Sequence, residues 1–574
     1  MSTFGSPGTL PTTKPSPPQR GSFPLDHDGT KIVGGVTPGR EGFHLGLPVL
    51  PALRQAMEQL KPDATAIYVA ARHAAAAIEE AIEGEVPLIV AVAEHIPLND
   101  MLRIQSILKI QSRPRLVDPN SPSIISATGR CRIGFQPLSC FSPGRIGIVA
   151  KSGTLSYETV ASTTRAGLGQ SLCIGVGGDI LPGIDLRESL AVFEQDGDTD
   201  AIALVGEIGG TGEIDAESWI RDHPEKFGEA FKARLDALAT RGQFHLDSRI
   251  RERTRAELHR MGRRERRHMF LAEGECMDLL RASGETSCGA GGYSGHGERC
   301  LLAIGIDRSA RSPCVIAAPT TNQECLVRTV KRYSFDFGRG RGPSELDIRH
   351  IAEHMQLRGT GMAADSLRHT VDSLTAIFYE NEAFLLTTHI VVGARFGFHD
   401  AAFPSGGRQG ALHTALAATS SEHGPYPEVQ RSGIVYIRLA GDGAVGTVVN
   451  GAGLAMNTVD ALQGNAASFL DTGGKATSDT VKASFEMVLR DPRVRVVFVN
   501  TFGGLKLGDM IVRGIILAFQ TLSLKVPVVV RIRGTKEKEG QQLIAESRLP
   551  LYAFNDFDEA AAKAVELSMR KPGS

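Results

Sequence analysis

Short apolar runs alternate with helical patterns along most of this chain. From Lys31 the runs are IVGGV, TAIYVAA, PLIVAVAE and RLVDP, and each is followed by a turn or by apolar residues at helical spacing. Near-continuous apolar strands separated by helices are typical of parallel sheets that are covered on both faces. The pattern therefore predicts an α/β fold.

The same alternation begins again twice further along the chain. A second unit starts at Gly144 with RIGIVAKSG, SLCIGVGG and AIALVGEIGG. A third starts near Ile434, where VGTVVNG, FLDTGG, RVVFVNTFGG, VPVVVRIRG and PLYAF alternate with helices. Because the third unit has its strands, helices and turns complete, we expect it to fold as an autonomous five-stranded parallel domain.

The segment between the second and third units differs in kind. Residues 249–267 contain nine Arg and three Glu with few apolar residues, which is typical of a solvated linker or an exposed helix. No aromatic residues are interleaved there on which bases could stack, so nucleic-acid binding is not predicted. Order resumes with the strand patterns CLLAIGIDRS and CVIAAPT, a helix from about Ser344 to Tyr379, and AFLLTTHIVV.

Composition narrows the class of protein. The 574 residues carry a formal net charge of -1, which offers no general attraction to nucleic acid or to an anionic membrane. The eight cysteines have no repeated spacing, which indicates a reducing compartment. No apolar run reaches the roughly 18 residues of a membrane span. Residues 1–28 start with a proline-rich stretch without a clear targeting segment, so we expect a disordered tail and a cytoplasmic or mitochondrial protein.

Chemistry is expected where strands end in glycine or small polar residues, because open α/β sheets bind ligands at the carboxyl ends of their strands. Two strand-to-helix turns have this character, and their residues are Ser152, Gly153 and Thr154 in the second unit and Gly473, Gly474 and Thr477 in the third. Backbone N–H groups at such helix starts can hold an anion. The alternative, that the glycines only permit a tight turn, stays open.

Several of these stretches resemble a known family. GGVTPGREGFHLGLPV, AEHIP, GRIGIVAKSGTLSYE, GLGQSLCIGVGGD and VGEIGG resemble the α subunit of succinyl-CoA synthetase, the ADP- or GDP-forming acid–CoA ligase. VNGAGLAMNTVD, ASFLDTGGKAT, VNTFGG and VPVVVRIRG resemble the C-terminal domain of its β subunit. The chain is therefore similar to an α–β fusion over residues 29–235 and 300–570. ATP-citrate lyase contains the same ligase module, but its citrate-synthase-like domain has no counterpart here.

The resemblance implies a domain order. It consists of a disordered tail (1–28), a truncated CoA-binding Rossmann-like domain (29–125), an α-type ligase domain (140–235), a basic linker with the start of the β part (236–299), a remnant ATP-grasp domain (300–432) and a β-type C-terminal ligase domain (433–574). Both ligase domains are expected to be flavodoxin-like.

The resemblance also implies an activity and the residues that carry it. Family members form or cleave an acyl-CoA thioester through an acyl phosphate, and a histidine carries the phosphoryl group. By position, Glu207 matches the carboxylate that orients this histidine, and Tyr157 matches the contact to the organic acid. Further substrate contacts match Asn450, Gly504, Leu505 and Lys506. The CoA-binding positions match Arg40, Val92, Ala93 and Glu94. The alternatives are a strand-end Glu207 and a surface Arg40 without these roles.

Pieces of the family pattern are missing from the sequence. After AESWIRD the family continues with a strand and a GHAGA loop that holds the phosphorylated histidine, whereas here Asp222 is followed directly by His223. His268 and His296 are the substitutes that the sequence offers. The nucleotide-gripping lobe has shrunk to ETSCGAGGYSGHGER, and Thr387, Thr388 and His389 stand where the family binds Mg²⁺. Uncharged Thr and His are poor Mg²⁺ ligands, so ATP or GTP with Mg²⁺ is doubtful and no metal site is assigned.

Two hypotheses follow for the function. In the first, the protein is an acid–CoA ligase, impaired as it stands, that binds CoA and a small carboxylic acid and obtains the missing pieces from a family subunit or in a homo-oligomer. In the second, it is a non-catalytic member that binds CoA or an acyl group, or acts as a partner protein.

Overall fold

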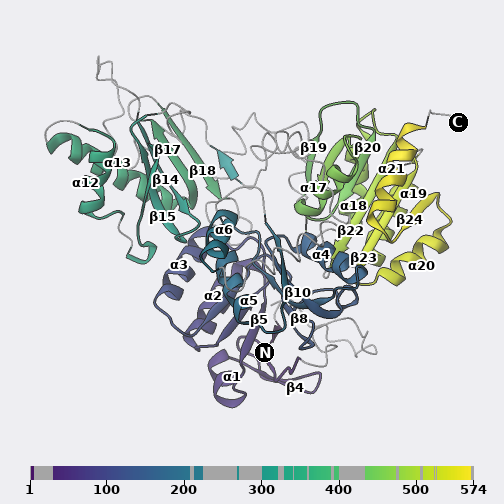
Figure 1. The fold of residues 1–574 in the computed structure, drawn as a ribbon, viewed down its shortest axis with the longest axis horizontal. Helices are drawn as coiled ribbons and strands as arrows, with labels where there is room; N and C mark the ends of the chain where they lie inside the picture. Colours follow the sequence, from purple (N-terminus) through teal and green to yellow (C-terminus); the bar gives the residue numbers. More distant parts are fainter. Residues whose placement is uncertain are drawn as a thin grey trace.

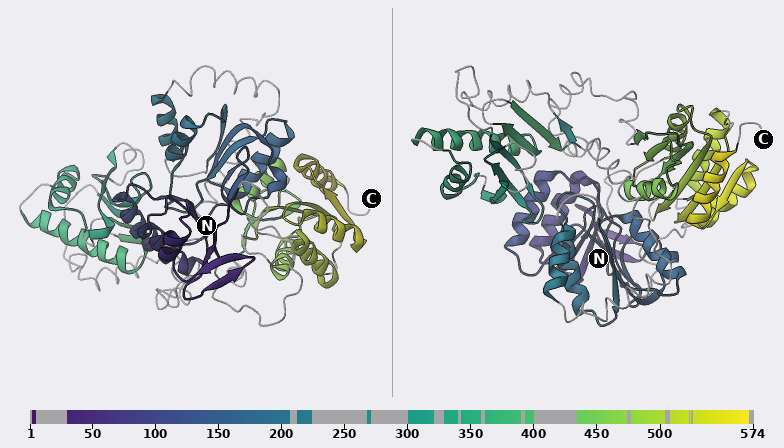
Figure 2. Two further views of the ribbon diagram at one scale, coloured as in Figure 1. Left: turned by 90° about the horizontal axis from the view of Figure 1, so that it is seen from below. Right: turned by 45° about the horizontal axis from the view of Figure 1, so that its top comes forward.

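The computed structural model describes residues 2–4, 30–206, 212–223, 268–270, 300–320, 329–339, 342–357, 361–389, 393–399, 434–473, 477–503, 508–522, 524 and 526–570. The N-terminal part forms the base of the molecule, and residues 300–399 and 434–570 form two lobes on opposite sides of it (Figures 1 and 2). The described helices include none that is long and apolar enough to cross a membrane.

The first sheet is parallel and has the strand order β1-β5-β6-β7. Its strands are β1 (Ser2–Phe4), β5 (Ala64–Tyr68), β6 (Leu88–Ala91) and β7 (Arg115–Val117), with helices α1 (Leu53–Gln59), α2 (Ala71–Glu83) and α3 (Leu98–Lys109). A small sheet of β2 (Gly35–Val36), β4 (Leu47–Leu50) and β3 (Gly42–His44) precedes α1.

The expectation of a disordered tail over residues 1–28 is wrong for Ser2–Phe4, which pair in parallel with Ala66–Tyr68. This strand has no recognisable sequence pattern because three residues are too few for a period. The pairing supplies the backbone hydrogen bonds that the outer edge of β5 would otherwise lack.

The second sheet has the order β12-β10-β11-β8-β9. It contains β8 (Ser123–Ser126), β9 (Cys131–Gly134), β10 (Pro143–Ala150), β11 (Gln170–Gly175) and β12 (Ala201–Val205), with helices α4 (Gly153–Arg165), α5 (Leu186–Gln195) and α6 (Gly212–Asp222). β8 pairs with β11, so the expected end of the first domain at residue 125 and start of the next at 140 are wrong. The junction lies between β7 and β8.

The lobe of residues 300–399 is an antiparallel sheet with the order β13-β18-β17-β14-β15-β16. Its strands are β13 (His268–Phe270), β14 (Leu301–Asp307), β15 (Ser312–Ala318), β16 (Lys331–Ser334), β17 (Ala383–His389) and β18 (Gly393–His399). The expected single helix from Ser344 to Tyr379 is instead two, α12 (Glu345–His354) and α13 (Gly361–Glu380). α12 ends at His354 and α13 begins at Gly361, and the low helix propensity of glycine favours a helix boundary there.

The C-terminal domain has the order β19-β21-β20-β22-β23-β24. Its elements are β19 (Val435–Arg438), β20 (Val445–Val449), α17 (Ala452–Ala461), β21 (Ser468–Asp471), α18 (Ser478–Leu489), β22 (Val496–Gly503), α19 (Gly508–Leu522), β23 (Val528–Gly534), α20 (Glu537–Ser547), β24 (Leu551–Phe554) and α21 (Phe557–Met569). The five expected parallel strands are present, but the sheet has a sixth strand, β19, which pairs antiparallel with β21 at the edge.

The two ligase-type sheets share one topology to different extents. The parallel strands of the C-terminal sheet follow the order 2-1-3-4-5 that characterises flavodoxin-like folds. In the N-terminal counterpart, β11, β10 and β12 give only the positions 2-1-3. Among the described residues β12 is an edge strand, and Leu204 on it is 37% exposed. The matching strand β22 has neighbours on both sides and is buried throughout.

Replacement of Phe485 tests the main core of the C-terminal domain. Its side chain is fully buried on α18 in a cluster that includes Val448 and Leu470. We expect Phe485→Ala to lower the free energy of unfolding by about 3–5 kcal/mol, the usual cost of lost burial and a new cavity. The measurement is denaturant unfolding of the full chain. Val435→Ala on the edge strand, where the side chain is 39% exposed, is the control and should cost less than about 1 kcal/mol. Equal losses would contradict this placement of the core.

Candidate functional site at the joint of the two ligase domains

The first helix of the N-terminal ligase domain, α4, meets the first helix of the C-terminal ligase domain, α17. Ser152 caps α4, and its hydroxyl accepts a hydrogen bond from Leu155 N. A Cβ on Gly451 would lie 2.9 Å from Thr154 Oγ1, and one on Gly453 would lie 2.6 Å from Ser152 Oγ. Gly451 also has a φ of 85°, which side chains disfavour. Glycine is therefore required where the two helix starts approach each other.

A carboxylate connects this contact with the second predicted loop. Asp471 Oδ1 accepts hydrogen bonds from Gly451 N at 2.6 Å and from Gly473 N at 2.8 Å. Thr477 caps α18 through a hydrogen bond from Thr480 N to its hydroxyl. The predicted turns at Ser152–Thr154 and at Gly473 are thus joined through the Gly451 turn.

Tyr157, the predicted contact to the organic acid, lies inside the joint. It is 3% exposed, and burial raises its pKa well above the usual value. Its ring packs against Phe502 of the C-terminal domain with 5.6 Å between centroids. The hydroxyl has no hydrogen-bond partner in the described part of the structure. A buried hydroxyl without a partner is costly, so this oxygen is a place where water or a ligand would form a hydrogen bond. The charged groups that act on it include Asp118 and Arg132.

Asn450, the predicted substrate contact from the other domain, is already engaged. Its Nδ2 donates to Phe502 O at 3.0 Å, and its Oδ1 accepts from Phe502 N at 2.8 Å. Both ends of the amide therefore fix the end of β20 to β22. Its contact with a substrate stays a prediction.

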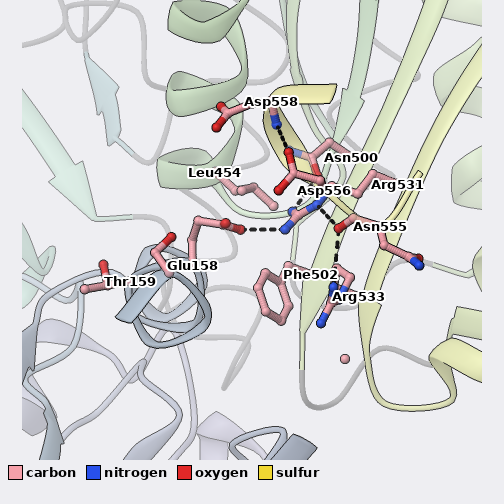
Figure 3. A network of polar contacts seen from close by, with 12 residues as sticks. Glu158, Thr159, Leu454, Asn500, Phe502, Arg531, Arg533, Asn555, Asp556 and Asp558 are labelled. Atoms are coloured by element: carbon pink, nitrogen blue, oxygen red, sulfur yellow. Dashed lines mark hydrogen bonds and ion pairs between the residues drawn. The ribbon is translucent and has the colours of Figure 1, made fainter. Parts of the chain in front are cut away.

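A buried ion pair crosses the same joint, and the sequence analysis did not identify it. Arg531 on β23 is fully buried, and its Nη2 lies 2.8 Å from Glu158 Oε2 on α4 (Figure 3). Arg531 Nη1 also donates to Asn500 Oδ1 at 3.1 Å. Burial lowers the pKa of Arg531, and the Glu158 carboxylate opposes that shift. The only sequence signal was a charged residue inside the apolar run VVVRIRG.

The predicted CoA-binding residues lie on two different elements. Val92, Ala93 and Glu94 are half-buried directly after the carboxyl end of β6, at the edge where open α/β sheets bind ligands. Arg40 is exposed in the turn between β2 and β3, where its backbone N donates to Thr37 O at 3.0 Å.

Several predicted residues lie outside the described part of the chain. They are Glu207, Gly474, Gly504, Leu505, Lys506 and the candidate carrier His296. The side chains of Thr387, Thr388 and His389 lie there as well, although their backbone belongs to β17.

Asp118 occupies the junction of the CoA-binding and ligase domains, and no sequence pattern indicated its burial. The residue is fully buried after β7, and its carboxylate accepts hydrogen bonds from the Ser121 and Ser123 hydroxyls just before and at the start of β8. Gly183 N donates to its backbone carbonyl at 2.8 Å. Burial raises the pKa of Asp118 to about 7, the two serines oppose this, and the nearby Asp179 adds to it.

Comparison with known proteins assigns these domains to a class. A family model described as CoA-ligase matches residues 149–228 and 448–565, and one described as CoA binding domain matches residues 22–95. The two stretches of the first match contain the two helix starts that meet at the joint.

The α subunits of succinate–CoA ligase are similar in sequence. Subunit alpha 1 of the ADP-forming enzyme from Archaeoglobus fulgidus is 43% identical over 198 residues, which are 34% of this chain and 67% of that protein. The α subunit from Aquifex aeolicus is 39% identical over 211 residues, 36% of this chain and 69% of that protein. A solved ATP citrate lyase from Methanothrix soehngenii matches with a TM-score of 0.30 and 22% identity over 34% of each chain. This chain belongs to the CoA-ligase family that includes the α subunits of the ADP-forming succinate–CoA ligases.

The buried Asp118 should make stability depend on pH. A carboxyl whose pKa rises from 3.8 to about 7 on folding binds its proton more tightly in the native state, so the contribution of Asp118 to stability is fully present below about pH 4 and is lost as the pH rises towards 7. This pKa shift corresponds to a contribution of on the order of 4 kcal/mol to the free energy of unfolding. Asn resembles the protonated acid, so Asp118→Asn should match the parent near pH 4.5 and exceed it at pH 8. Thermal melting of both proteins across this range measures the difference. A difference that does not change with pH would contradict the assignment.

Proposed function

We propose that the joint between the ligase domains binds the acyl or phosphoryl group of an acid–CoA ligase reaction. The observation that carries this proposal is the buried hydroxyl of Tyr157, which has no hydrogen-bond partner in the described part of the structure and belongs to the helix whose start meets the C-terminal ligase domain. The family assignment supports a small carboxylic acid and CoA as ligands, because the similar α subunits are named succinate–CoA ligases. The lobe of residues 300–432 is then the remnant of the family's ATP-grasp domain.

The residues present suit an anionic ligand. Backbone N–H groups at the start of α4 carry partial positive charge, and the Tyr157 hydroxyl can donate to a carboxylate or an acyl-phosphate oxygen. CoA would pass over the carboxyl edge of the first sheet at Val92–Glu94 and bring its sulfur to the joint. Arg40 would contact the cofactor nearer to its phosphates. These roles require only binding and orientation.

The phosphorylation half of the reaction is less well supported by the residues present. It needs a metal-bound nucleotide, a carrier histidine and a carboxylate to orient it, and groups that act as a unit fail together. Among the described residues no three His, Cys, Asp or Glu side chains gather as a metal site. We therefore derive no step through ATP, GTP or Mg²⁺, and we infer that turnover requires a family subunit or another copy that supplies the missing pieces.

One observation favours a non-catalytic member as the second candidate. The amide of Asn450 is held at both ends by the Phe502 backbone, so a substrate contact would have to displace existing hydrogen bonds. Such a protein would keep CoA or acyl binding without forming a thioester.

Calorimetry with CoA, with and without succinate, tests ligand binding, which both candidate functions require. We expect binding, and we expect Tyr157→Phe to weaken succinate binding about 10-fold because a hydrogen bond to a charged group is lost. Tyr552→Phe, at a 37% exposed site on β24, is the matched control and should leave affinity unchanged. Absence of CoA binding would contradict the proposal.

Labelled nucleotide tests whether the chain alone carries out the phosphorylation half of the reaction. With ATP or GTP and Mg²⁺, we expect the chain alone to form no acid-labile phosphohistidine. Labelling that is lost in His296→Ala would show instead a ligase with a relocated carrier.

A further inference from the structure

The aromatic ring of Phe502 connects the residues on the two sides of the joint. Tyr157 packs on it from α4, and the guanidinium of Arg531 lies 5.3 Å from its centroid. Asn450 holds its backbone. Glu158, which pairs with Arg531, is the residue after Tyr157, and Figure 3 shows it extending from α4 towards Arg531 past Phe502.

Two neighbouring residues of α4 are thus fixed in different directions. Successive residues of an α-helix point about 100° apart, so Tyr157 against Phe502 and Glu158 against Arg531 together fix the rotation of α4 about its axis. The tyrosine hydroxyl lies at the end of a long side chain. A rotation of about 15° would therefore displace it by about 2 Å, enough to change a bound geometry.

Stability alone does not require charges at this place. Replacing both residues of a buried ion pair by apolar side chains of similar size often leaves the free energy of unfolding unchanged. The reason is that the cost of removing two charges from water is no longer incurred. Arg531 is fully buried, and Glu158 has only 12% of its side chain exposed. The pair differs from an apolar one in making directional contacts. Arg531 also donates hydrogen bonds to Asn500 Oδ1 at 3.1 Å and to the backbone carbonyl of Asn555 at 3.4 Å.

We propose that Glu158 and Arg531 are positioning residues that hold α4 in the rotation at which the Tyr157 hydroxyl meets the acyl or phosphoryl ligand. The proposal rests on the proposed function for the identity of that ligand. The positioning of Tyr157 itself is a property of the chain and can be measured without it.

The test replaces the pair as a unit in the full-length protein. In Glu158→Met with Arg531→Met we expect a melting temperature within a few degrees of the parent, while Tyr157 loses its fixed environment. Nitration by tetranitromethane, mapped by peptide mass spectrometry, reports this: the rate at Tyr157 should rise at least 10-fold, and that at Tyr552 should stay constant. Arg165, which also faces Glu158 at 3.6 Å, has 44% of its side chain exposed and stays solvated.

Succinate affinity provides the second readout. The double Met variant should bind about 10-fold more weakly, and adding Tyr157→Phe to it should cause no further loss, because the pair acts through that hydroxyl. Glu158→Asp, which keeps the charge, should recover part of the affinity. The control replaces the surface pair Lys482 and Glu486 of α18 by Met, where neither readout should change.

The outcomes separate the two proposals. Faster nitration of Tyr157 without ligand binding in the parent would support the positioning role and overturn the proposed function. Parent-like nitration in the double variant would overturn the positioning role whatever the binding result. A large fall in melting temperature with all tyrosines equally reactive would also overturn it, because the pair would then be structural only.

Discussion

The structure depends on one shared interior, the packing of α4 against the C-terminal ligase domain. Tyr157 and Val160 from α4 lie in a single core cluster with Leu454 and Phe502 from the other domain. The Arg531–Glu158 pair closes this cluster between residues that are 373 positions apart in the chain. Because the interior belongs to both domains, neither can keep its half of the site in place without the other, and the strand-end glycines at Gly451 and Gly453 are the positions where close approach is needed.

The two ligase domains contribute unequally to this interior. The C-terminal domain has the whole 2-1-3-4-5 sheet, and the strand at its fourth position, β23, supplies Arg531. The N-terminal domain has only the 2-1-3 part among the described residues. Its helix α4 receives a charged partner from β23 of the C-terminal domain across the joint. The same difference explains why Leu204 on β12 is exposed while its counterparts on β22 are buried.

Much of this fold follows from local sequence patterns, and the parts that do not are long-range. The apolar runs predicted β20 to β24 because central parallel strands are buried on both faces and read as continuous apolar segments. The short strands β1 and β19 were not predicted, since pairing with β5 and β21 creates them and no local period does. The same reason applies to the site. Ser152 and Thr477 are visible as helix caps in the sequence, but the Glu158–Arg531 contact and the burial of Asp118 exist only once the domains pack.

The placement of the polar groups also separates binding from chemistry. Asp471 and Asn450 spend their hydrogen-bonding capacity on backbone groups at Gly451, Gly473 and Phe502, so they set the shape of the joint. The buried Tyr157 hydroxyl, by contrast, has no hydrogen-bond partner in the described part of the structure. In the proposed function this hydroxyl and the backbone N–H groups at the start of α4 bind and align an anion, which is a separate task from attacking a phosphoryl group. Under that proposal the joint is a binding site, and the source of the nucleophile decides whether the protein acts as a ligase.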